Sequence, residues 1–233
     1  MFAALFLDNK KRGFYKIKCK YFLWQKVRIT FVLAPVPKNA GQLKKLKNAL
    51  SEYKGRVILT AKTKIHSELE GYLYNGENFM KRVLAEAFFT YVKKQRPKAI
   101  AIFDDGFLNL NYYKTLSTYT DGMYLECSLP QEALAEEILK ESGIVIWRKN
   151  LAKNGTAFLN LDKDRKETFL GLDNKIFDVR DMENLSAELK TLLPKELKEL
   201  SPFSVLSFLF YQCGERVVLE SAVKIVLSAQ KYL

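Results

Sequence analysis

The amino-acid sequence predicts an α/β protein with a doubly wound, mostly parallel sheet of five strands, of the flavodoxin or Rossmann type. Two observations support this prediction. Short, almost purely apolar runs alternate with segments of helical spacing, and Gly, Pro or Asp residues separate them. Such runs suit strands that are buried on both faces, and strands that alternate with helices form right-handed crossovers in a parallel sheet.

The five strands expected in this sheet follow one another from residue 27 to residue 147. They are 27–33, 56–60, 99–103, 122–126 and 144–147. The helices expected between them are 41–53, 78–92, 110–117 and 130–141. Gly55 and Gly143 stand where helix C-termini favour glycine, and Pro130 stands at a favoured first-turn position. We expect the flavodoxin-like strand order 2-1-3-4-5.

The two ends of the chain follow other patterns. Residues 2–7 and 14–24 read as an N-terminal β-hairpin whose second arm alternates lysines with apolar residues. Residues 156–161 and 167–172 share the tract Phe-Leu-x-Leu-Asp and read as a second hairpin. Two apolar helices follow, and they suit either a core or a homo-oligomer interface. The expected divisions are therefore the basic hairpin 1–26, the α/β core 27–150 and the C-terminal region 151–233.

The composition favours a cytoplasmic protein. Its three cysteines are an odd number set far apart, which suits reduced thiols better than a disulfide framework. The charged residues near the N-terminus follow the apolar run, the reverse of a secretory signal, and the longest apolar tract is too short to span a bilayer. Residues 1–60 hold 14 Lys/Arg and two acidic residues, which accounts for the whole net charge of +12. This asymmetry is typical of proteins with a polyanionic partner.

The common catalytic and cofactor motifs are absent. Gly71 and Gly76 have P-loop spacing, but Glu77 and Asn78 stand where that motif needs Lys and Ser or Thr. No Gly-x-Gly-x-x-Gly follows an expected strand, and His66 is the only histidine. The sequence therefore excludes a Walker-type NTPase, the usual dinucleotide site and multi-histidine metal sites.

The best candidate site follows the expected strand 99–103. In open α/β sheets, ligands bind beyond the carboxyl ends of the strands, and three of the expected strands end in polar residues there. The candidate ligand-binding residues are Asp104, Asp105, Gly106, Ser128 and Lys149. The adjacent carboxylates of Asp104 and Asp105 suit a hard cation such as Mg²⁺. The alternative is that Asp104, Asp105 and Gly106 form a turn, since Asp and Gly are common turn residues.

The basic hairpin is the second candidate. Its cationic side chains, which would contact phosphates, are Lys10, Lys11, Arg12, Lys16, Lys18 and Lys20. Lysines on a terminal strand also prevent edge-to-edge aggregation, so the same pattern has a structural explanation.

Three functions remain open on the sequence alone. The first is the binding of an anionic or phosphorylated ligand, or of a protein partner, at the strand ends near Asp104 and Asp105. The second is association with nucleic acid through the basic hairpin. The third is a metal-dependent hydrolase or phosphotransfer enzyme that uses Asp104 and Asp105.

Overall fold

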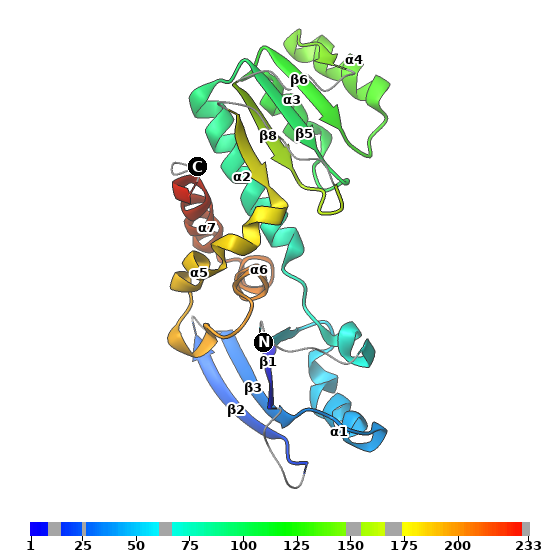
Figure 1. Cartoon of the computed structure of the whole chain (residues 1–233), viewed down its shortest axis with the longest axis vertical. Helices are drawn as coiled ribbons and strands as arrows, with labels where there is room; N and C mark the ends of the chain where they lie inside the picture. Colours follow the sequence, from blue (N-terminus) through cyan, green and yellow to red (C-terminus); the bar gives the residue numbers. More distant parts are fainter. Residues whose placement is uncertain (9–14, 25–26, 61–66, 148–154, 166–173, 230–233) are drawn as a thin grey trace. The chain divides into compact units, whose positions relative to one another are not determined.

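The computed structural model describes the chain except for residues 9–14, 25–26, 61–66, 148–154, 166–173 and 230–233 (Figure 1). The described residues form an α/β protein with two compact units. The first unit consists of residues 1–77 and 189–218, and the second of residues 78–188 and 219–233. Both units are therefore built from separate stretches of chain, unlike the three consecutive regions that the sequence suggests.

The first unit contains a four-stranded mixed sheet with the order β2-β3-β1-β4. Its strands are β1 (Phe2–Asp8), β2 (Lys18–Trp24), β3 (Val27–Pro35) and β4 (Val57–Leu59). β1 pairs in parallel with both β3 and β4, whereas β2 pairs antiparallel with β3. The predicted hairpin between residues 2–7 and 14–24 is not formed, because β3 lies between β1 and β2. β2 is an edge strand, which agrees with its lysines.

Helices cover both faces of this sheet. On one face, α1 (Ala40–Leu50) buries Leu43, Leu46 and Leu50 against a cluster that includes Leu5 of β1 and Val32 of β3. Asn39 begins α1, and its side chain accepts a hydrogen bond from the Gln42 backbone N–H at 2.9 Å. This cap satisfies one of the N–H groups that a helix start leaves without an intrahelical partner.

The other face is covered by α6 (Pro202–Cys213), which returns to the first unit late in the chain. The ring centroids of Phe2 and Phe208 lie 4.8 Å apart, and Tyr74 packs edge-on against Phe208 at 5.6 Å. Gly76 lies so close to α6 that an added Cβ would stand 2.5 Å from the Phe203 carbonyl carbon. The close approach of the α6 backbone therefore gives Gly76 a packing role.

The second unit contains a parallel sheet with the order β7-β6-β5-β8-β9. Its strands are β5 (Ala99–Phe103), β6 (Gly122–Glu126), β7 (Ile146–Trp147), β8 (Thr156–Asn160) and β9 (Lys175–Asp178). Counted along the chain, this order is 3-2-1-4-5, the same as the first five strands of the six-stranded Rossmann order and unlike the expected flavodoxin order. The predicted single sheet is wrong, because expected strands 27–33 and 56–60 belong to the first unit.

β8 and β9 also differ from the expected C-terminal hairpin. They pair in parallel, with Phe158 opposite Ile176 and Leu159 opposite Phe177. Residues 167–172, which were expected to form the second arm, lie outside the described residues. The Phe-Leu-x-Leu-Asp repeat therefore does not produce an antiparallel pair of the described strands.

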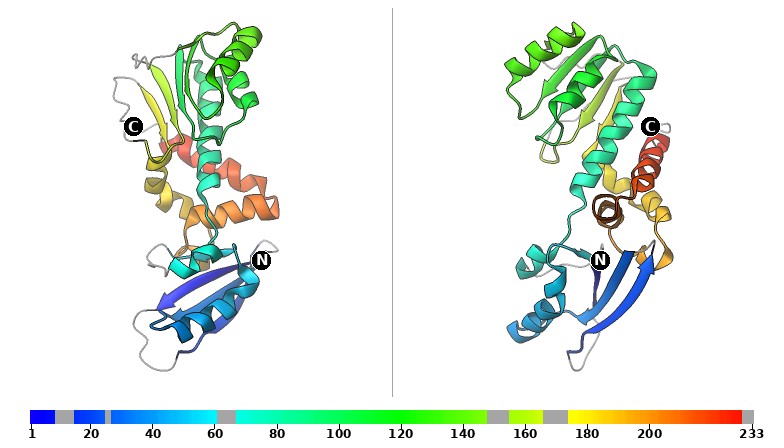
Figure 2. Two further views of the ribbon diagram at one scale, coloured as in Figure 1. Left: turned by 90° about the vertical axis from the view of Figure 1, so that its right-hand side faces the viewer. Right: turned by 180° about the vertical axis from the view of Figure 1, so that it is seen from behind.

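The long helices of the second unit are α2 (Glu77–Gln95), α3 (Leu110–Ser117) and α4 (Gln131–Ser142). Phe88 of α2 packs against Phe177, which lies on the same face of the sheet as Ile102. Tyr113 of α3 donates a hydrogen bond to Asp104, which lies two residues after Ile102. α2 and α3 thus lie on the same face (Figure 2). On the opposite face, the Arg165 guanidinium lies over the Phe103 ring, and the contacts of the described residues place no helix there. A doubly wound sheet, which has helices on both faces, is therefore not observed in the described part of the chain.

Shorter elements and α7 complete the described chain. The 3-10 turns are Ser51–Tyr53, Ser67–Tyr72, Val179–Leu185, Lys190–Leu192 and Lys195–Leu197, and α5 is Ser186–Leu189. α7 (Arg216–Ala229) follows α6 after Gly214, whose φ of 72° ends α6 in the left-handed region. None of the helices in the described ranges combines the length and the apolar character needed to cross a membrane.

Candidate functional site

The carboxyl ends of the parallel strands in the second unit carry polar side chains. Asp104 directly follows β5, the central strand of this sheet, as the sequence predicted. Glu126, Asn160 and Asp178 are the last residues of β6, β8 and β9. Because the strands are parallel, these four residues mark one edge of the sheet, where open α/β sheets bind ligands.

Asp104 is buried, and its carboxylate accepts hydrogen bonds from within the protein. Only 5% of its surface is exposed. One carboxylate oxygen accepts a hydrogen bond from the Phe107 backbone N–H at 2.9 Å, and the other accepts from the Leu108 N–H at 3.0 Å and from the Tyr113 hydroxyl at 2.7 Å. Burial, and then the hydrogen bond to Asp104, raise the pKa of Tyr113 far above its ordinary value of 10.0. These contacts fix the loop between β5 and α3.

The neighbours of Asp104 have different roles. Asp105 forms an ion pair with Lys81 of α2, whose side chain is only 7% exposed. Gly106 has a φ of +102°, and a Cβ there would lie 2.8 Å from the Ser128 hydroxyl oxygen. The structure thus brings Gly106 and Ser128 together, whereas Lys149 lies outside the described residues. No group of three or more His, Cys, Asp or Glu side chains suited to a metal ion occurs in the described ranges.

Arginines bind two other carboxylates at this edge. Arg165 donates to both oxygens of Glu126, at 2.8 and 3.1 Å, and its guanidinium carbon lies 3.8 Å from the centre of the Phe103 ring. The hydrogen bonds from Arg165 lower the pKa of Glu126. Asp178 forms an ion pair with Arg180 and also accepts from the Asn160 amide at 3.1 Å. Because these carboxylates have partners within the protein, most of the polar residues at this edge can be explained without a bound ligand.

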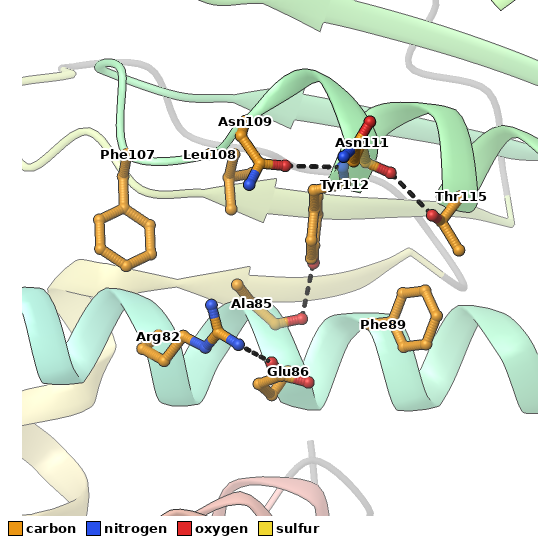
Figure 3. A pocket seen from close by; sticks show the side chains of 10 residues that line it. All are labelled: Arg82, Ala85, Glu86, Phe89, Phe107, Leu108, Asn109, Asn111, Tyr112 and Thr115. Carbon is orange, nitrogen blue, oxygen red and sulfur yellow. Dashed lines mark hydrogen bonds and ion pairs between the residues drawn. The ribbon is translucent and has the colours of Figure 1, made fainter. Parts of the chain in front are cut away.

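A pocket of about 330 Å³ opens next to the Asp104 loop, between α2 and α3 (Figure 3). We call it the α2–α3 pocket. Its apolar walls come from Phe89, Phe107, Tyr112, Leu108 and Ala85, and its polar groups come from Arg82, Glu86, Asn109, Asn111 and Thr115.

Hydrogen bonds hold the walls of this pocket in position. The Tyr112 hydroxyl donates to the Ala85 carbonyl oxygen at 2.6 Å, which ties α3 to α2. The Asn109 side chain accepts from the Tyr112 backbone N–H at 3.0 Å and so begins α3. Burial raises the pKa of Tyr112 well above 10.0, so its hydroxyl remains a donor at neutral pH.

One charged pair lies at the base of the α2–α3 pocket. Arg82 and Glu86, one turn apart on α2, form an ion pair at 2.8 Å. Figure 3 shows them below the aromatic ring of Tyr112, with Phe107 and Phe89 at the two ends of the pocket. No local sequence pattern predicts this pocket, although Phe107 and Asn109 follow Asp104 and Asp105 closely.

The basic hairpin candidate is only partly described, since Lys10, Lys11 and Arg12 lie outside the described residues. Lys16 precedes β2, and Lys18 and Lys20 are exposed on it. Lys20 lines a surface hollow that also contains Glu196 and Glu199. Within this hollow, carboxylates therefore offset part of the positive charge that would attract a polyanion.

Comparisons with known proteins do not assign a family. No family model matches the sequence, and no curated protein matches it either. Among solved structures, L-tryptophan dehydrogenase from Nostoc punctiforme is similar over 87% of this chain and 70% of that chain, with 13% identity and a TM-score of 0.39. This similarity is too low to support an argument. The fold and its contacts define the chain as an α/β protein whose second unit carries a pocket beside the strand ends.

Proposed function

We propose that the second unit is a small-molecule-binding α/β domain whose ligand occupies the α2–α3 pocket. The observation that supports this most directly is the set of hydrogen bonds that the Asp104 carboxylate accepts from Phe107, Leu108 and Tyr113. A buried carboxylate with three hydrogen bonds holds the loop that supplies Phe107 and Leu108 to the pocket wall. Binding sites gain affinity when their walls are fixed before the ligand arrives, because less conformational entropy is lost on binding.

The lining groups favour a ligand with an aromatic body and a single carboxylate. Phe89, Phe107 and Tyr112 offer ring surfaces for offset or edge-on packing. The Arg82 guanidinium suits a carboxylate, which it can bind with two parallel hydrogen bonds. Glu86 lies beside it and disfavours ligands of higher negative charge, so a monoanion fits better than a phosphate dianion.

The geometry favours such a ligand over a metal ion at Asp104 and Asp105. The Asp104 oxygens already accept three hydrogen bonds, and Asp105 pairs with Lys81. A Mg²⁺ ion would have to displace these donors from carboxylates that point to different partners.

Ligand-observed NMR with benzoate, phenylacetate and cyclohexanecarboxylate tests the proposed function. We expect the two aromatic acids to bind better than the aliphatic acid. Arg82→Gln should weaken their binding by roughly tenfold, as the loss of a charge-assisted hydrogen bond implies. Lys93→Gln is the control, because Lys93 lies on the same helix but does not line the pocket. Equal losses in the two variants, or no binding by any of the acids, would contradict the proposal.

A further inference from the structure

The second unit has another pocket, formed by α2, β9 and α7, which we call the lysine pocket. It has a volume of about 330 Å³. It is lined by Thr90, Tyr91, Lys94, Gln95, Lys175, Lys224, Leu227 and Ser228. Lys175 is the first residue of β9, so this pocket lies toward the amino ends of the strands, away from Asp104 and the α2–α3 pocket.

The charge of the lysine pocket is its main feature. Three lysines from three different elements line the pocket, and none of the described lining residues carries a carboxylate. Neither Lys94 nor Lys224 forms an ion pair with any acid in the described part of the chain. Lys94 also lies in the last turn of α2, where a cation interacts favourably with the helix dipole. That effect explains Lys94 but not Lys224, which lines the same pocket from α7.

Like charges that face one pocket repel one another, and a bound anion relieves that repulsion. The other lining groups suit an anion that carries an apolar body. The Tyr91 and Ser228 hydroxyls can donate hydrogen bonds to oxyanions, while the Tyr91 ring and Leu227 provide apolar contact. Burial raises the pKa of Tyr91, so its hydroxyl keeps its proton at neutral pH.

We propose that the lysine pocket binds a phosphorylated small molecule with an aromatic or other apolar body. A phosphomonoester carries a charge of about −1.5 to −2 at neutral pH and three oxygen acceptors. Because it carries more negative charge, it matches a pocket with Lys94 and Lys224, which have no acidic partner among the described residues, better than a monocarboxylate does. This site is additional to the α2–α3 pocket, where Arg82 and Glu86 balance each other and favour a ligand of lower charge.

Isothermal titration calorimetry of the full chain tests the proposal with four probes: phenyl phosphate, pyrophosphate, benzoate and a single-stranded oligonucleotide. We expect phenyl phosphate to bind this pocket saturably, with an affinity that falls as salt is added because exposed lysines are screened. Lys94→Gln and Lys224→Gln should each weaken phenyl phosphate binding by about two- to fivefold. Lys93→Gln is the matched control, since Lys93 is the neighbouring exposed lysine of α2 and does not line the pocket.

The results separate this proposal from the proposed function and from general surface charge. Arg82→Gln should leave phenyl phosphate binding unchanged, and Lys94→Gln should leave benzoate binding at the α2–α3 pocket unchanged. If Lys93→Gln weakens phenyl phosphate binding as much as Lys94→Gln does, only general surface charge attracts the anion and the proposal is wrong. It is also wrong if phenyl phosphate and pyrophosphate do not bind, or if only a single-stranded oligonucleotide binds.

Discussion

Replacing Asp104 by Asn tests whether this residue is a structural centre of the second unit. Asn has nearly the same size as Asp, so the substitution removes the charge and one acceptor without opening a cavity. If the amide oxygen keeps the bonds from Leu108 and Tyr113, the amide NH₂ must face the Phe107 N–H, and two donors then oppose each other. The variant thus loses a hydrogen bond to a charged acceptor and leaves a donor near Phe107 without one.

These contacts set the expected size of the effect. A hydrogen bond to a charged group contributes about 1.5–3 kcal/mol, and a buried donor left without an acceptor costs about 1–3 kcal/mol. Because the two contributions overlap, we expect Asp104→Asn to lower the free energy of unfolding by about 2–4 kcal/mol. Tyr113→Phe removes only one donor from Asp104 and should cost about 1.5–3 kcal/mol, the contribution of a single hydrogen bond to a charged group. Asp121→Asn should change stability by less than about 0.5 kcal/mol, because Asp121 is exposed.

Urea denaturation followed by circular dichroism measures these differences, and the transition that includes the second unit is the one to compare. In thermal melts, Asp104→Asn should lower the Tm by roughly 5–15 °C. If Asp104→Asn is as stable as Asp121→Asn, the three hydrogen bonds do not stabilise the loop. The assignment of Asp104 as the residue that positions the pocket wall would then fail as well.

Two further predictions concern other contacts. Gly76→Ala should destabilise the protein by about 2 kcal/mol or more, because its Cβ would lie 2.5 Å from the α6 backbone. Gly71→Ala should be nearly neutral, because a Cβ at Gly71 would have no atom within 4 Å, and thermal melts compare the two variants. Above pH 10, the unfolded chain ionises Tyr113 while the folded chain keeps its proton, so stability should fall by up to about 1.4 kcal/mol per pH unit. Tyr113→Phe should reduce this slope in urea titrations between pH 9 and 11, and an unchanged slope would contradict the buried, proton-retaining phenol.

Local patterns predicted many elements of the second unit well. The strands 99–103 and 122–126 and the helix 110–117 have the predicted bounds. Each is specified by nearby residues: an apolar run, the Asn109 cap, or helical spacing. Gly143 has a φ of 71° and ends α4, as its position before an expected strand indicated.

Strand partners were harder to predict, because they depend on residues that are far apart in sequence. β1 is buried along its first four residues and needs a neighbour at each edge, so it lies between β3 and β4. The lysines of β2 suit an edge position, which both a β1–β2 hairpin and the observed β2–β3 pairing provide, so they did not distinguish the two. The two pockets were missed for the same reason, since α2 meets α3 at one pocket and β9 and α7 at the other.

The discontinuous first unit has a consequence for how the protein is made. The sheet of β1–β4 leaves the ribosome long before α6, which packs against Phe2 and is synthesised only with residues 202–213. The apolar face around Phe2 therefore remains uncovered while the second unit is being translated. A nascent chain that stalls at residue 188 would present this face to chaperones and proteases, although most of the second unit would already be present.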